Sequence, residues 1–108
     1  MAQNFRRYTA NGIGTSAVTL VTADSYDTIV GISVANVSTS SVNVEVYIND
    51  GVNDIHLVKD APIPQGSQLQ VLDGGAKFVL QSGDALKVKS DTASSLDVWV
   101  SAVDAIST

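Results

Sequence analysis

The sequence predicts an all-β domain, an antiparallel β-sandwich of the Ig-like or the jelly-roll type. Apolar and polar residues alternate in several short segments, as is typical of strands with one buried face. Turn-forming residues separate these segments about every ten residues. Apolar residues at helical spacing are absent, so we expect no substantial helix. Together these observations predict seven to eight short strands.

The alternation is clearest in residues 42–49, where valine or isoleucine occupies every second position from Val42 to Ile48. In the same way, Val30, Ile32 and Val34 are expected to face the core. Further strands are predicted over residues 86–89 and 96–101, and weaker ones over 17–22, 54–59, 68–72 and 77–80.

Turn and proline chemistry locates the ends of these strands. Asp50-Gly51 is a strong hairpin signal, because both residues tolerate a positive φ. Pro62 and Pro64 flank Ile63, and proline lacks the N–H that a central strand needs. We therefore expect an edge strand or a crossover at Ile63.

Composition limits the range of functions. The chain has 108 residues, enough for one domain, and its formal net charge of −5 argues against nucleic-acid binding. It has no cysteine, and no apolar run is long enough for a transmembrane helix, so no membrane partner is expected. Only 16% of residues are charged, which suits β-structure that neighbouring molecules cover.

Residues that carry catalysis or bind metals are sparse. His56 is the only histidine, and without cysteines it cannot complete a usual zinc site, so we interpret it as a surface or interface residue. Asp50, Asn53 and Asp54 offer oxygen ligands for calcium, but their spacing is not that of an EF-hand, and turn chemistry explains them better. We predict a non-enzymatic protein with no catalytic residue, cofactor or metal.

Residues 1–12 differ from the rest of the chain. They are polar, show no apolar alternation and end in Asn11-Gly12. We interpret residues 1–12 as an N-terminal arm that adds little to the core of a β-sandwich domain over residues 13–108. The arm either is a solvated terminus or docks on an acidic neighbouring subunit. Its docking residues would be Phe5, Arg6, Arg7 and Tyr8.

Two aromatic residues lie on the non-core side of their strands by alternation. Trp99 lies between Val98 and Val100, and Tyr47 precedes Ile48. An outward-facing tryptophan on a sheet indicates that something covers that face. The cover is another chain, a ligand such as a sugar ring, or the arm itself. Tyr47 and Trp99 therefore join the four arm residues as predicted interface residues.

The sequence resembles the small β-sandwich virion proteins of tailed bacteriophages, especially those of marine cyanophages. The resemblance runs through most of the chain and rests on the order and spacing of several short segments. They are Asn4-Phe5-Arg6-Arg7-Tyr8, Gly14-Thr15-Ser16-Ala17, Val34-Ala35-Asn36, Val44-Glu45-Val46-Tyr47, Leu57-Val58-Lys59-Asp60-Ala61-Pro62-Ile63-Pro64, Gly66-Ser67, Leu80-Gln81-Ser82-Gly83-Asp84, Leu86-Lys87-Val88 and Ser94-Ser95-Leu96-Asp97-Val98.

The resemblance implies a structural role in a virion that is assembled in the host cytoplasm. The implied partners are other copies of the chain and other virion proteins, namely major capsid, neck or tail proteins. The role would be capsid decoration or cementing, or a neck- or tail-associated position. An alternative from another class is a carbohydrate-binding module that uses Tyr47 and Trp99 as a platform for sugar rings. A small hydrolase is a weaker alternative, since no nucleophile motif is present.

Overall fold

The computed structural model describes residues 2–23, 26–72 and 77–106, which form nine strands and no helix. The all-β prediction is confirmed, and the ninth strand comes from the opening segment. In the described residues, no helix exists that is long and apolar enough to cross a bilayer.

The strands are β1 (Ala2–Ile13), β2 (Val18–Thr22), β3 (Tyr26–Asn36), β4 (Val42–Asn49), β5 (Asp54–Ile63), β6 (Gln68–Leu72), β7 (Phe78–Leu80), β8 (Ala85–Ser90) and β9 (Leu96–Ile106).

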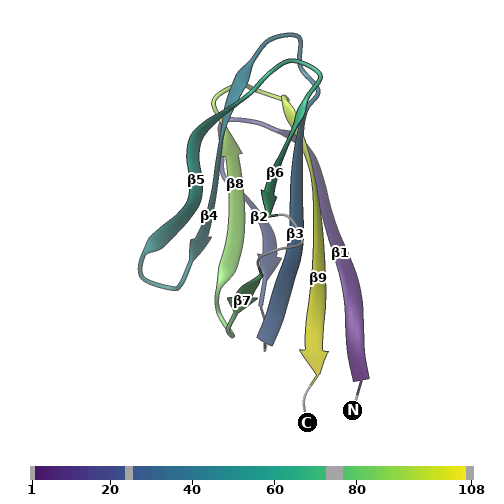
Figure 1. Cartoon of the computed structure of the whole chain (residues 1–108). Coiled ribbons are helices and arrows are strands. Elements are labelled where there is room, and N and C mark those ends of the chain that lie inside the picture. Colours follow the sequence, from purple (N-terminus) through teal and green to yellow (C-terminus); the bar gives the residue numbers. More distant parts are fainter. Residues whose placement is uncertain (1, 24–25, 73–76, 107–108) are drawn as a thin grey trace.

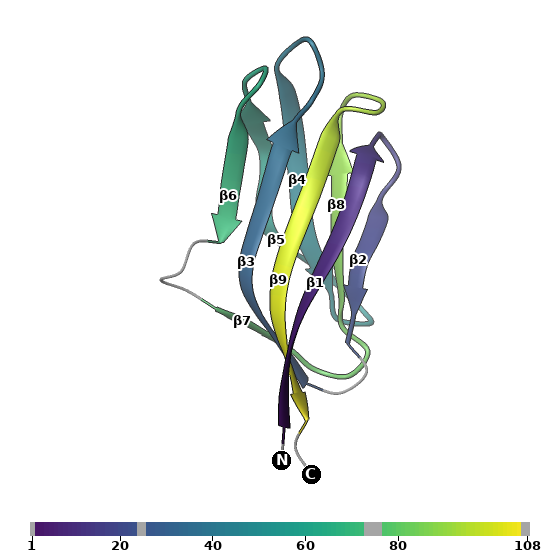
Figure 2. The ribbon, with the colours of Figure 1, turned by 90° about the vertical axis from the view of Figure 1, so that its right-hand side faces the viewer.

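The strands form two antiparallel sheets that face each other (Figure 1). Sheet A has the order β1-β9-β3-β6, with β7 also paired to β3, and sheet B has the order β2-β8-β4-β5. Most connections cross from one sheet to the other. This strand order is that of a jelly roll. Of the two sandwich types that the sequence left open, the structure is therefore the jelly roll and not the Ig-like type. Figure 2 looks onto the outer face of sheet A, with both chain ends at its lower edge.

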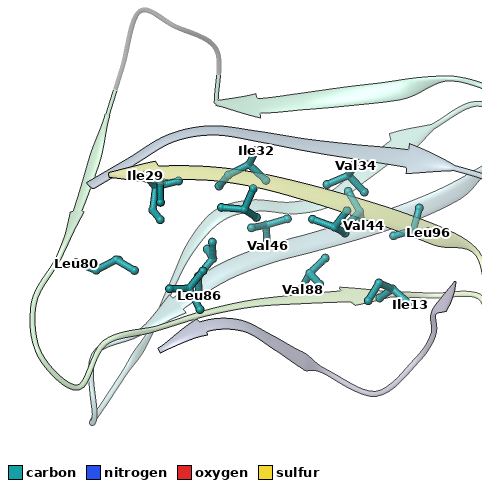
Figure 3. Close-up of a cluster of buried hydrophobic side chains, with 14 of the residues drawn as sticks. Ile13, Ile29, Ile32, Val34, Val44, Val46, Leu80, Leu86, Val88 and Leu96 are labelled. Atoms are coloured by element: carbon teal, nitrogen blue, oxygen red, sulfur yellow. The ribbon is translucent and has the colours of Figure 1, made fainter. Parts of the chain in front are cut away.

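The core lies between the two sheets and consists almost entirely of valine, isoleucine and leucine (Figure 3). Every second residue of β4 from Val42 to Val46 is at most 1% exposed, as the alternation predicts. Val98 and Val100 of β9 and Leu86 of β8 complete the same layer. Each fully buried side chain of this kind contributes about 1.5–3 kcal/mol.

One core assignment is wrong because of a β-bulge. The register between β3 and β9 shifts between Ile29 and Gly31. A bulge adds one residue to a strand and so reverses the alternation on one side of it. Ile29 is therefore fully buried, whereas Val30, which we expected to face the core, is only partly buried.

The segment around Pro62 is part of an edge strand, as expected. β5 lies at the end of sheet B, and its register with β4 shifts twice. Asp60 has a φ of 55°, in the left-handed region, at the first of these irregularities. Proline, bulges and charge are the features that keep an edge strand from pairing with other chains.

The expectation that the opening segment lies outside the strand pattern is wrong. β1 pairs with β9 in continuous register from Ala2↔Ile106 to Ala10↔Val98. Tyr8 and Ala10 pack against the core, so the segment contributes to it rather than adding little. Whether residues 13–108 fold without residues 1–12 stays a prediction.

The Asn11-Gly12 pair forms a bulge at the end of β1. The register shifts between Ala10 and Ile13, and Gly12 has a φ of 64°, which glycine adopts without strain. The backbone N–H of Gly12 donates to Oδ1 of Asp97, 3.1 Å away. This contact fixes the bulge to β9.

A buried asparagine organises the loops at the opposite end from the chain termini. Asn36 is 2% exposed. Its Nδ2 donates to the carbonyl oxygens of Ser40 and Ile63, each at 2.8 Å. Its Oδ1 accepts from the backbone N–H and the hydroxyl of Ser38. The side chain thus links the loop after β3 to the end of β5.

Candidate interaction surface

The pairing of β1 with β9 places three of the predicted interface residues on one surface. Directly opposed residues in antiparallel strands point to the same face of the sheet. Arg7 is opposite Ser101 and Thr9 is opposite Trp99, while Val98 and Val100 point into the core. Phe5, Arg7 and Trp99 therefore share the outer face of sheet A, which is the face toward the viewer in Figure 2.

We name this surface the A face. Phe5, Val79 and Trp99 are 79%, 64% and 52% exposed on it. Large apolar side chains on a soluble surface are informative when they share one face. The register also assigns to the A face Arg7, Thr9, Thr28, Gly31, Ser33, Ala35, Asp97, Ser101 and Val103.

The guanidinium of Arg7 lies over the indole ring of Trp99, with 5.4 Å between its central carbon and the ring centroid. This is a cation–π geometry, which contributes about 0.5–1 kcal/mol at exposed sites. β1 thus covers part of Trp99, one of the alternatives that the sequence left open. About half of the indole remains exposed.

The other two predicted residues of the opening segment belong to the inner side of sheet A. Tyr8 is opposite buried Val100 and packs against the core. Arg6 is opposite buried Ala102, so its position is also on the inner side. The structure therefore divides the Phe5-Arg6-Arg7-Tyr8 segment between two faces.

A shallow groove runs beside Trp99 between β1 and β9. Its volume is about 550 Å³, and Arg7, Thr9, Asn11 and Asp97 line it together with Trp99. Asp97 already accepts the N–H of Gly12 through Oδ1. The groove combines an exposed aromatic ring with hydrogen-bonding groups.

Tyr47 lies on the outer face of sheet B, which we name the B face. It points away from the core as predicted, but it is only 8% exposed. The ring of His56 lies 5.1 Å from the ring of Tyr47, centroid to centroid. Tyr47 and Trp99 are therefore on opposite sides of the molecule and cannot form one platform.

The surroundings of Tyr47 are charged. Nε2 of His56 lies 2.6 Å from Oε2 of Glu45. Burial raises the pKa of the Tyr47 hydroxyl above its usual value, and the carboxylates of Asp54 and Glu45 raise this pKa further. Lys87 and Lys89 are opposite Tyr47 and Glu45 on β8.

The carboxylates considered for calcium make turn contacts. Oδ1 of Asp50 accepts the backbone N–H groups of Val52 and Asn53, at 3.0 and 2.8 Å. These bonds lower the pKa of the Asp50 carboxyl. Oδ1 of Asp54 accepts the side-chain amide of Asn49 at 2.7 Å. Within the described ranges, no three carboxylate or histidine side chains gather as a metal site would require.

Comparison with known proteins adds fold relationships and no family. No family model and no curated protein matches the sequence. A chain of the acidic stable capsid structure of Helicobacter pylori bacteriophage KHP30 is similar in fold, with a TM-score of 0.63 and 13% identity. That match covers 99% of this chain and 90% of the phage chain.

Two other solved structures are similar over most of the chain. A pentameric capsid protein from metagenomic phage sequences matches with a TM-score of 0.53 and 15% identity. This match covers 92% of this chain and 60% of the capsid protein chain. Bacillus endospore appendages, described as disulfide-linked pili, match with a TM-score of 0.55 and 14% identity. This match covers 98% of this chain and 88% of the appendage chain. At these identities the likeness shows the fold.

Sequence reasoning did not single out Thr9 or Val79 as part of this surface. In the opening segment the outward set of Phe5, Arg7 and Thr9 and the inward set of Arg6, Tyr8 and Ala10 each mix aromatic, polar and small residues. No apolar face distinguishes the two sets, so the pattern does not indicate a strand. Val79 lies in a strand of three residues, too short for a period to be clear.

Proposed function

We propose that this protein is a non-enzymatic structural subunit of a bacteriophage virion, held in place by contacts with other subunits. The observation that supports this most is the jelly roll itself, which matches a phage capsid chain over 99% of this sequence. The spore-appendage neighbour, which is described as forming disulfide-linked pili, also has a structural role. Because this sequence has no cysteine, disulfides cannot link its subunits.

The finer proposal is a capsid-decorating, neck-associated or tail-associated protein of a tailed phage related to those of cyanophages. Its partners would be copies of itself and the major capsid, neck or tail proteins, joined during assembly in the host cytoplasm. The exposed Phe5, Val79 and Trp99 support an outer face of sheet A that is covered in the particle.

The copy number per particle tests this proposal. Purified virions would be separated by gel electrophoresis, and the band would be quantified against the major capsid protein. Hundreds of copies would indicate capsid decoration or a tail tube, and about a dozen would indicate the neck or a fibre. Absence of the protein from purified virions would contradict the proposal.

A carbohydrate-binding function is a second candidate, and the groove beside Trp99 supports it. Sugar rings stack on exposed aromatic rings, and the neighbouring Arg7, Asn11 and Asp97 can bind hydroxyl groups. Tyr47 takes no part, because it lies on the B face. Glycan-array binding that is abolished by Trp99→Ala would favour this candidate.

A further inference from the structure

The two outer faces of the sandwich differ in charge. On the A face, the charged side chains at the described, paired strand positions are Arg7 and Asp97. On the B face, Glu45, Asp54, Lys87 and Lys89 lie on the strands, together with His56. Charged side chains are depleted at the centre of protein interfaces, so the A face has the composition of a covered surface.

We infer that a second copy of this chain covers the A face, packed face to face about a two-fold axis that crosses the strands at the level of Trp99. In this arrangement Arg7 of each copy pairs with Asp97 of the other. The inference deepens the proposed structural function and rests on it for its place in the virion.

The register supplies the geometry. Arg7 is level with Ser101 on β9, and Trp99 lies midway between Ser101 and Asp97. A two-fold axis that lies between the two faces, perpendicular to the strands and level with Trp99, reverses the direction of the strands and stacks each strand on its own copy. Arg7 of one copy then lies at the same height along the strands as Asp97 of the other. The two residues are on neighbouring strands, so they are offset sideways by only about 4.8 Å.

Charge also favours this pairing. The chain carries a net charge of −5, so two copies repel each other in most orientations. At its described, paired strand positions the A face carries one residue of each sign, and the two-fold axis brings opposite signs together twice. Among the described residues Arg7 contacts Trp99 and forms no ion pair within its own chain, so its guanidinium can donate hydrogen bonds to a partner's carboxylate.

The overlapping area fits a weak, reversible dimer. With the axis at Trp99, the two copies overlap over the levels of residues 96–102 of β9, which is about seven residues on each of β1, β9 and β3 and the five residues of β6. At about 3.3 Å per residue and about 4.8 Å between strands, this strip presents about 400 Å² on one face. Two such strips would bury about 800 Å², which is the size of a weak or transient interface. An indole at the centre of such a contact is a typical hot spot.

A charge-exchange experiment tests the pairing. Arg7→Glu and Asp97→Lys variants of the full chain would be studied alone and mixed in equal amounts by analytical ultracentrifugation. Each variant alone brings like charges together and should lose at least about tenfold in dimer affinity. In the mixture both contacts again join opposite charges, so a heterodimer with affinity near that of the natural chain should form.

Two control variants separate the effect of this charge pair from the effects of net charge and of the bulge. Lys89→Glu makes a similar charge change on the B face and should leave the dimer unchanged. Asp97→Asn keeps an oxygen that can accept from Gly12, so a loss of affinity in this variant reports the charge rather than the bulge.

Several results would overturn the inference. One is that the natural chain is monomeric at about 100 µM. Another is that the single variants lose dimer affinity and that their equimolar mixture does not regain it. If the chain is monomeric but present in virions, the dimer is wrong and the proposed function stands. If it dimerises as described but is absent from virions, the proposed function fails and the dimer stands.

Discussion

Arg7 and Trp99 are 92 positions apart in the sequence, yet the guanidinium of one lies over the indole ring of the other. The contact exists because β1 pairs with β9 along the edge of sheet A. It joins the opening segment to the single tryptophan of the chain and so links the edge strand to its neighbour on the A face.

Trp99→Ala should weaken association far more than folding. Half of the indole is exposed, and the side chain lies outside the core, so its removal opens no core cavity. At the centre of an interface its loss should cost about 2 kcal/mol or more of association free energy. Urea unfolding and sedimentation equilibrium measure the two quantities.

Leu86→Ala is the matched core control for this comparison. Leu86 is fully buried, so its truncation should lower the free energy of unfolding by about 2–5 kcal/mol. A loss of monomer stability in Trp99→Ala as large as that in Leu86→Ala would show that Trp99 belongs to the core.

Deletion of residues 1–10 should destabilise the domain, in contrast to what the polar sequence of this segment suggests. The deletion removes the neighbour of β9 and uncovers Val98 and Val100, which lie opposite Ala10 and Tyr8. Thermal unfolding followed by circular dichroism should show a clearly lower Tm than that of the full chain. The full-length Arg6→Ala/Arg7→Ala variant keeps the backbone pairing of β1 and should lose far less Tm than the deletion, and an unchanged Tm after deletion would show that β1 is dispensable.

Asn36→Ala should destabilise the fold by about 2 kcal/mol or more. The substitution removes the two N–H donors and the oxygen acceptor of the side-chain amide. The carbonyl oxygen of Ile63 then loses its hydrogen bond from Nδ2 of Asn36. Asn36→Asp should be destabilising as well, because a carboxylate cannot donate to two carbonyl groups. Asn43→Ala, at an exposed position on the B face, is the control. Equal stability of all three variants in urea unfolding would refute the structural role of Asn36.

The stability of the fold should decrease at alkaline pH, in part through Tyr47. Its pKa is raised in the folded protein, so the unfolded chain releases the proton more readily. The corresponding stabilisation is complete below about pH 10, the ordinary tyrosine pKa, and is lost as pH rises through the folded value. Tyr47→Phe should reduce the slope of stability against pH above 10. A slope identical to that of the natural chain would contradict the assignment.

Most strands could be predicted because their two faces differ in chemistry. β4 alternates valine with polar residues, since one face packs in the core and the other meets solvent. β1 could not be predicted in this way. It is an edge strand whose inward positions include Arg6 and whose outward positions include Phe5, so no simple alternation marks it.

The candidate interaction surface was only partly predictable for a related reason. Alternation places Trp99 outward without any knowledge of the fold. The approach of Arg7 to Trp99 depends on which strand pairs with β9, and a single sequence does not contain the strand order. The near burial of Tyr47 likewise depends on His56, a residue from a neighbouring strand.

Hydroxyl-radical footprinting of intact virions tests the central claim most directly, since it needs no substitution in the chain. Trp99 on the A face and His56 on the B face are both exposed in the single chain and both react with such radicals. We predict that the oxidation rate of Trp99 is strongly reduced in the virion relative to the dilute purified protein. The oxidation rate of His56 should change less between the two samples. Oxidation of Trp99 at the same rate in both samples would contradict the claim that the A face is covered.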